Sequence, residues 1–212
     1  MKVYAEFIEE NGIEYRTKTI LQFGSSWNLI GSIVMKNPGS AFPKNEISNE
    51  DWNKVAENEL VSNSLQTNWF EFQPDPTMGQ VERVFNGYYT GNQIELNGVI
   101  QVFNLFNIRH QKINVAKQLA SESKSVYLYP QASAVIDSFK NKPVFLGFGW
   151  EYLNVNRSFA ENMFEYVKAS DFMYLKKDMI DNFFYHPGYI NTAYSKEVVN
   201  ETLKSFSRYF LN

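Results

Sequence analysis

A short turn at residues 37–39 is the first place in this 212-residue chain where chemistry could occur. Asn37 precedes Pro38, and a residue before proline is held in an extended conformation, so its side-chain amide can be presented outward. Gly39 follows, and its small size lets a bound molecule approach the backbone closely. An amide fixed in this way could orient a water molecule or a ligand through its donor and its acceptor.

Two later segments add a cation and an imidazole. Asn104 and Arg109 come at the end of an apolar segment, and the guanidinium of Arg109 is suited to phosphate or carboxylate. His186 begins a His-Pro-Gly turn, where its ring could donate a hydrogen bond to a developing anion. We therefore expect Asn37, Asn104, Arg109 and His186 to line one cleft.

Each of these segments also has a purely structural interpretation. An Asn-Pro-Gly sequence is a turn in most proteins, and a histidine before proline is often a loop residue that bonds to backbone. Arg109 could instead form an ion pair with a nearby glutamate. Asp75, which precedes a proline, is fully explained as a helix cap. What favours a shared site is that the segments 36–40, 104–109 and 186–189 all follow predicted strands.

The elements that would position these side chains indicate an α/β protein. Short apolar strands alternate with helices, which is typical of a mostly parallel sheet covered on both faces, a three-layer α/β/α sandwich. Ligand sites of such sheets lie in the loops after the carboxyl ends of the strands. The predicted sheet strands are 30–35, 98–105, 125–129, 143–147 and 171–175, and an antiparallel pair at 3–8 and 15–23 is expected to extend or flank them.

Helices are expected where a capping residue precedes apolar residues at helical spacing. The predicted helices begin at Ser48 (reaching Leu60), at Asp75 (reaching Tyr88), near 112, at 131, at Asn156 and near Ser195 (reaching Phe210). No repeat or flexible linker interrupts the chain, so residues 1–212 are expected to form a single α/β domain.

The composition excludes several kinds of site. The chain has no cysteine, which excludes disulfides, thiol nucleophiles and zinc sites that need sulfur. It has only two histidines, so a histidine-rich metal site is excluded as well, and no metal or cofactor is expected. The sequence lacks the G-x-S-x-G, Walker A and G-x-G-x-x-G patterns.

Charge and hydropathy bear on the partners and the compartment. The net charge of −3 argues against a broadly basic nucleic-acid binder. No apolar run approaches the roughly 20 residues that span a membrane. The N-terminal sequence carries acidic residues where a signal peptide would be apolar, so we expect a cytoplasmic protein.

Four segments of the chain resemble a widespread uncharacterised family of bacterial and phage proteins. In order they are IVMKNPGSA, PDPTMGQVERVFNGYY, VFNLFNIR and HPGYI. Members of that family read roughly L-N-P-S-T-A, then D-P-T, then N-L-F-x-x-R, then H-P-x-Y, and the resemblance spans about residues 17–192. The chain departs from the pattern at Gly39 and Ser40, where the family has Ser and Thr, and at Lys36, where it has an apolar or small residue.

The same order of motifs is similar, more remotely, to that of the uracil-DNA glycosylase superfamily. There, a motif after a central strand positions the attacking water, and residues 37–39 are similar to its mismatch-specific form G-I-N-P-G. A later strand ends in an asparagine that reads a base edge, as GVIQVFN ends in Asn104. A last motif begins H-P-S and contacts base and phosphate, and residues 186–188 are similar to it with Gly for Ser.

This resemblance implies a uracil-DNA glycosylase-like fold that recognises a nucleobase or nucleotide, with hydrolysis of an N-glycosidic bond as the implied reaction. Asn37 would orient the water, and His186 would stabilise the departing base. Asn104 would pair with the base edge, and an aromatic such as Phe42 would stack on the base. The remaining expected ligand-binding residues are Pro38, Gly39, Arg109 and Tyr189.

Two questions about the function stay open at this point. The alternative to an enzyme is a non-catalytic binding or interaction protein that reuses the fold. The other question is the partner. The negative charge, and the lack of an apolar wedge in 186–195 beyond Tyr189 and Ile190, favour a small nucleobase-containing ligand or single-stranded nucleic acid over duplex DNA.

The sequence around His186 predicts a neutral imidazole. Phe183, Phe184, Tyr185 and Tyr189 make its surroundings apolar, and desolvation disfavours the charged ring, so its pKa should fall below the ordinary value of about 6.5. A neutral ring would donate from one nitrogen to a ligand oxygen, while a backbone carbonyl or side chain holds the other. The alternative is that His186 simply caps its loop.

Overall fold

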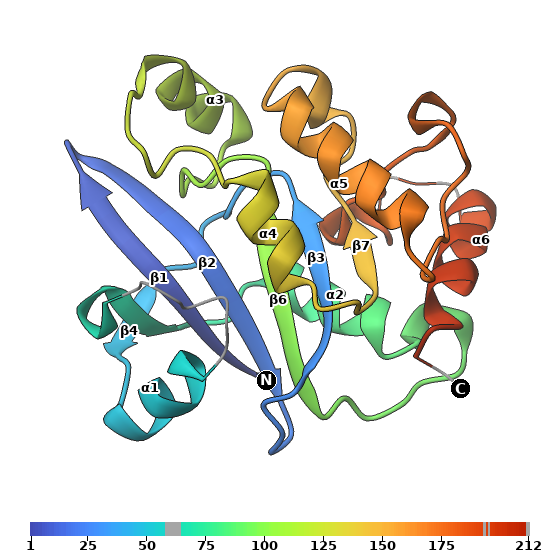
Figure 1. The fold of residues 1–212 in the computed structure, drawn as a ribbon, viewed down its shortest axis with the longest axis horizontal. Helices are drawn as coiled ribbons and strands as arrows, with labels where there is room; N and C mark the ends of the chain where they lie inside the picture. The colour runs from blue at the N-terminus through green and yellow to red at the C-terminus, as the bar shows by residue number, and fades with distance from the viewer. Residues whose placement is uncertain (58–64, 193, 195, 211–212) are drawn as a thin grey trace.

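The computed structural model describes residues 1–57, 65–192, 194 and 196–210. It has an α/β fold built on a seven-stranded sheet in the order β4-β5-β1-β2-β6-β3-β7 (Figure 1). The strands are β1 (Lys2–Glu10), β2 (Ile13–Phe23), β3 (Leu29–Met35), β4 (Pro43–Glu46), β5 (Trp69–Phe72), β6 (Gly98–Asn104) and β7 (Val144–Leu146).

The sheet is mixed, so the prediction of a mostly parallel sheet is wrong. Only β3–β6 and β3–β7 are parallel pairings, and the other four are antiparallel. The N-terminal hairpin causes the difference. Its turn places Asn11 and Gly12 at φ 55° and 75°, which suits a tight two-residue connection. The hairpin then enters the middle of the sheet, because β2 pairs with β6.

Two segments that were predicted as strands, 125–129 and 171–175, have no strand structure. At the start of the first segment and directly before the second, a serine side chain accepts a hydrogen bond from the backbone N–H two residues later, at 3.1 Å for Ser125 and 3.2 Å for Ser170. Such local bonds offer the backbone an alternative to strand pairing. The short strands β4 and β5, which the sequence did not indicate, extend the sheet beyond β1.

Six helices surround the sheet in the described part of the chain. They are α1 (Asn49–Ala56), α2 (Pro76–Phe85), α3 (Ile113–Glu122), α4 (Ala132–Ser138), α5 (Arg157–Ala169) and α6 (Lys196–Ser207). Helices α4 and α5 contact each other on one face of the sheet, and α2 lies on the opposite face, where it contacts α6 (Figure 1). None of the described helices is both long and apolar enough to cross a membrane.

The predicted helix caps are confirmed at two positions. The side chain of Ser48 accepts from the N–H of Asp51 at the start of α1, and that of Asp75 accepts from Met78 at the start of α2. Helix α5 also begins directly after Asn156, as predicted, but the Asn156 side chain makes no cap bond and instead donates to the carbonyl of Leu105 at 2.8 Å.

Two helix ends also differ from the sequence pattern. Helix α2 ends at Phe85, short of Tyr88, and α6 ends at Ser207, short of Phe210. Leu60 and Ser195, at the predicted end of one helix and start of another, lie outside the described residues.

The core lies where the two helical layers meet the parallel strands. Every residue of β6 is buried, as expected for a central strand covered on both faces. Phe206 of α6 is fully buried and packs against Phe145 of β7 and Phe85 of α2, with ring centroids 5.0 and 5.3 Å apart. This packing joins α2 and α6 to the sheet at β7, which pairs with β3.

Candidate functional site

A group of loops meets at the carboxyl ends of the parallel strands. The N–H of Leu105, after β6, bonds to the carbonyl of Met35 in β3 at 2.9 Å. The loop after β7 is tied to a distant segment, since the N–H of Gly149 bonds to the carbonyl of Phe184 at 2.6 Å. Helix α2 packs against the short 3-10 turn Pro187–Tyr189. These contacts bring the loop after β3, the start of α2 and the turn at His186 close to one another.

A cavity of about 150 Å³ lies among these loops. Its polar side chains are Arg16, Lys36, Asn37, Asp75, Thr77, Gln111 and His186, and its other walls are Met35, Pro38, Gly39, Met78, Ile113 and Tyr189. A cavity of roughly this size can hold one benzene ring. It therefore has room for one ring or one small ion, with anything larger projecting outside.

Five of the eight predicted site residues line this cavity: Asn37, Pro38, Gly39, His186 and Tyr189. The amide nitrogen of Asn37 donates to the carbonyl of His110 at 3.0 Å. A carbonyl can only accept, so this bond fixes the orientation of the amide and leaves the Asn37 Oδ1 for another donor. Gly39 adopts φ +71°, a conformation that favours glycine.

The other three predicted residues are not among those that line the cavity. Asn104 is buried, because all of β6 is enclosed by neighbouring elements, and its side-chain oxygen has no hydrogen-bond partner among the described residues. Phe42 is 56% exposed and lies away from the cavity. The expectation that Asn37, Asn104, Arg109 and His186 share one cleft is therefore met by only two of the four.

Arg109 forms an ion pair with a glutamate, which was the structural alternative considered for it. Its guanidinium forms an ion pair with Glu14 and donates to the carbonyls of Ser40 and Ala41, at 2.7 Å and 2.5 Å. The backbone N–H of Arg109 also bonds to the carbonyl of Glu14 at 2.8 Å. The side chain fastens the loop after β3 to the N-terminal hairpin.

This role predicts a loss of stability when Arg109 is replaced. We expect Arg109→Met to lower the free energy of unfolding by about 1–3 kcal/mol, because two loop carbonyls lose their donor. Urea denaturation measures the change. The control is Arg157→Met, which removes an exposed ion pair with Glu161 within α5 and should have little effect. Equal stability of Arg109→Met and wild type would contradict the role.

Arg16 is the main residue of the cavity that the sequence did not reveal. It is 1% exposed, donates to the carbonyl of Pro38, and its Nε and Nη1 have no hydrogen-bond partner among the described residues. Burial lowers its pKa to about 10, so it stays charged at neutral pH. In the sequence, Arg16 alternates with Glu14 and Lys18, and nothing local marks it as the buried one. In the structure, a register shift at Thr17 pairs Arg16 with Phe7 and Lys18 with Glu6, so Arg16 and Lys18 lie on opposite faces of the sheet.

Lys36 places a second cation at the cavity. Its Nζ lies 4.7 Å from the centre of the Tyr189 ring, a cation–π contact. Burial lowers the pKa of Lys36, which Glu151 partly offsets and Lys117 reinforces. Tyr189 is 45% exposed, so its ring forms part of the rim.

The electrostatic prediction for His186 is confirmed. The ring is 9% exposed, and burial, with a further contribution from Lys36, lowers its pKa to about 3. Its Nδ1 accepts a hydrogen bond from the N–H of Gly188 at 3.2 Å. The partner was predicted to be a carbonyl or side chain, and that detail is wrong. Because Nδ1 accepts, the proton of the neutral ring is on Nε2, which has no partner among the described residues.

A carboxylate and a hydroxyl complete the wall at the start of α2. Asp75 uses its Oδ1 to accept from the N–H of Met78 at 2.9 Å, and its Oδ2 lies towards Gly39. Thr77 lies against the turn that carries His186, since its Oγ1 is only 3.2 Å from the point that a Cβ on Gly188 would occupy. These residues belong to the D-P-T motif, so three of the four resembling segments meet in the cavity.

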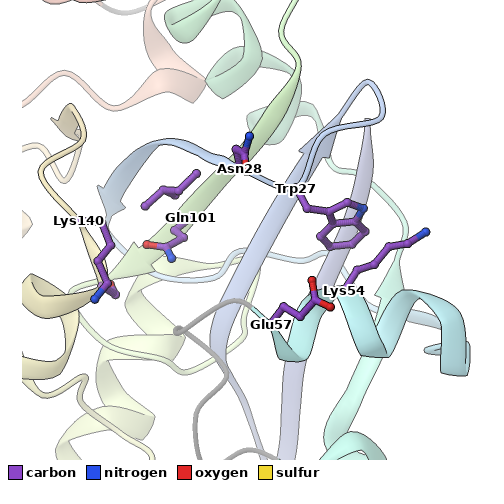
Figure 2. A pocket seen from close by; sticks show the side chains of 8 residues that line it. Trp27, Asn28, Lys54, Glu57, Gln101 and Lys140 are labelled. Atoms are coloured by element: carbon purple, nitrogen blue, oxygen red, sulfur yellow. The ribbon is translucent and has the colours of Figure 1, made fainter.

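A larger pocket of about 300 Å³ lies near the other end of the parallel strands, beside the first residues of β3. Figure 2 shows Lys54 and Glu57 of the α1 region beside Trp27 on one side of it, and Lys140 on the opposite side. The side chain of Gln101 accepts a hydrogen bond from Ser32 at 3.2 Å. No residue that was predicted to do chemistry lies there, so the strand-end cavity is the better candidate site.

Among the described residues, no three histidine, aspartate or glutamate side chains lie close enough together to hold a metal ion. Comparison of the chain with protein-family models, with curated proteins and with solved structures finds no match. The case for a function therefore depends on the geometry of the strand-end cavity.

Proposed function

We propose that the protein binds a small nucleobase-containing ligand, one end of which enters the strand-end cavity. The observation that carries the proposal is the Nε2–H of His186, a neutral donor without a partner among the described residues, in the wall of a cavity of one-ring size. The Oδ1 of Asn37 adds an acceptor. Donors and acceptors fixed by their second hydrogen bonds suit the recognition of a polar planar ligand.

The dimensions favour a free ligand over a duplex. A cavity of about 150 Å³ holds one ring or one phosphate, and the rest of a nucleotide would extend past the exposed ring of Tyr189. An aromatic face at the rim suits stacking with a base or a sugar. A uracil-DNA glycosylase-like relationship, inferred from the similar order of the motifs, is part of this proposal. A single-stranded nucleic acid is the alternative partner.

Hydrolysis of an N-glycosidic bond is a second candidate function. It is favoured by two oxygen acceptors in the cavity, the Asn37 Oδ1 and the Asp75 Oδ2, which could orient a water molecule while His186 donates to the departing base. Hydrolysis needs the base itself inside the cavity, and the position of Asn104 outside it leaves the expected reader of the base edge missing there. Binding without catalysis is therefore the stronger candidate.

The test compares two replacements of histidine by asparagine. His186→Asn keeps an acceptor for the N–H of Gly188, since the asparagine Oδ1 takes the place of Nδ1, but it removes the Nε2–H. We expect it to weaken ligand binding by about 1–3 kcal/mol. Calorimetric titration with uracil, uridine, adenosine, their 5′-monophosphates and a short single-stranded DNA measures the effect.

The matched control is His110→Asn, which replaces the other histidine of the chain outside the cavity and should bind like the wild type. Chromatographic detection of free base in the same samples decides whether the bound ligand is also hydrolysed. Wild-type affinity in His186→Asn, or no binding of any of these compounds, would refute the proposed function.

A further inference from the structure

The buried guanidinium of Arg16 is a charge without a counter-ion at hydrogen-bond distance. It makes no ion pair among the described residues, and its single bond is to the carbonyl of Pro38. A buried cation in a protein is normally paired or bound to a ligand, because removing an unpaired charge from water is strongly unfavourable. Arg16 forms part of the cavity wall, so a molecule in the cavity would lie next to this charge.

The rest of the wall adds to the positive potential. Lys36 contributes a second cation from the loop after β3. His186 is neutral and offers an N–H, and Thr77 offers a hydroxyl at the first turn of α2, a helix of ten residues. Backbone N–H groups at a helix start also favour an anion. The cavity is thus electropositive within a chain whose net charge is −3.

Asp75 is the one carboxylate among the described residues that line the cavity, and it opposes this potential in part. Its Oδ1 is held by the N–H of Met78, and the attraction between Asp75 and Arg16 acts without an ion-pair contact between them. Two cations against one carboxylate leave the cavity with an excess of one positive charge.

We propose that the cavity binds one oxyanion of the phosphate type as the counter-ion of Arg16 and Lys36. The oxyanion accepts hydrogen bonds from the ammonium of Lys36, the Nε2–H of His186 and the hydroxyl of Thr77, and it lies against the charge of Arg16. For the nucleobase-containing ligand, the phosphate enters the cavity and the base lies outside, beside Tyr189. This last placement rests on the proposed function, whereas the oxyanion site does not.

The test is a calorimetric titration of inorganic phosphate at pH 7 in a phosphate-free buffer of low ionic strength. Wild type should bind phosphate, and Lys36→Met and Arg16→Gln should bind it on the order of tenfold or more weakly, since each loses a charged partner. Asp75→Asn should bind more tightly, and asparagine caps a helix as well as aspartate does, so α2 is preserved.

Lys168→Met is the matched control. Like Lys36, Lys168 places its Nζ over an aromatic ring, 5.9 Å from the centre of Phe164, but it lies on α5 away from the cavity. It should bind phosphate like the wild type. Should Arg16→Gln fail to fold, as its melting curve would show, Lys36→Met and Asp75→Asn decide the question on their own.

A second arm separates this inference from the proposed function. It compares uridine 5′-monophosphate with uridine, and adenosine 5′-monophosphate with adenosine. Phosphate binding with the expected variant effects, and nucleotides tighter than both nucleosides and phosphate, support both proposals. Binding of nucleosides without any phosphate binding overturns the oxyanion site and leaves the proposed function. Phosphate binding that the nucleoside part never improves leaves the oxyanion site and overturns the nucleobase ligand. Equal phosphate binding by wild type and Lys36→Met overturns the oxyanion site.

Discussion

Acidification from pH 7 to pH 4 should lower the free energy of unfolding by about 3 kcal/mol through His186 alone. The pKa of this histidine is about 3 in the folded protein, because of burial and the nearby Lys36, against an ordinary value of 6.5. Between pH 6.5 and pH 3, His186 is protonated in the unfolded chain but stays neutral in the folded protein. The unfolded state is therefore favoured progressively as the pH falls below about 6.5, and the whole contribution is lost near pH 3.

The measurement is a series of urea denaturation curves at pH 7, 5.5 and 4 for wild type and His186→Asn. The variant is expected to start from a lower stability, because a buried ring is lost, but to lose about 3 kcal/mol less over this interval. Carboxylates contribute to acid denaturation in both proteins and cancel in the comparison. His110→Asn serves as the second reference. Parallel stability profiles for wild type and His186→Asn would show that the folded protein accepts the proton on His186.

Removal of the Phe184 ring should have an effect of similar size on stability and an additional effect on the site. Phe184 is fully buried, and its ring packs 4.5 Å from Phe148, 5.6 Å from Tyr152 and 6.2 Å from Phe164. Phe184→Ala is expected to cost about 3–5 kcal/mol. The ring anchors the segment that leads into His186, so we also expect a loss of ligand or phosphate binding under conditions where the variant is folded.

Phe206→Ala is the control for this experiment. Phe206 is equally buried, so Phe206→Ala should lower the free energy of unfolding by a similar amount. Its ring, however, packs between α2, α6 and β7. Thermal unfolding followed by calorimetric titration well below both melting temperatures separates stability from binding. The prediction is contradicted if Phe184→Ala and Phe206→Ala bind equally well.

Local signals in the sequence were enough to predict much of the fold. Strands β3 and β6 are compact apolar runs, and α1 and α2 begin at caps whose side chains do accept the expected backbone N–H groups. The errors have a different origin. Segments 125–129 and 171–175 have strand-like composition, but serine-to-backbone bonds decide their conformation. The position of the N-terminal hairpin depends on pairing with β6, about 80 residues later in the chain, which no local pattern encodes.

The candidate site divides in the same way. Asn37 and His186 were found because each stands in a turn motif that fixes its backbone. Arg16 was missed because Glu14, Arg16 and Lys18 alternate in the sequence, and this pattern does not distinguish one charged residue from another. Arg16 is buried by the loop at Pro38 and by helix α2, which lie far from it in the sequence. The ion pair of Arg109 was foreseen, but its partner was not. Glu14 becomes its neighbour because the N-terminal hairpin lies beside residues 108–109 in the folded chain.

The walls of the cavity come from both ends of the chain, since Arg16 belongs to the second strand and His186 and Tyr189 precede the last helix. Two walls of one cavity that lie about 170 positions apart in the chain come together only after a long loop has closed, which is a slow step in folding. A folding intermediate that holds only the hairpin or only the later helices has no such cavity. Ligand affinity would therefore serve as a probe of completed folding, appearing in a refolding experiment only after the two ends of the chain have met.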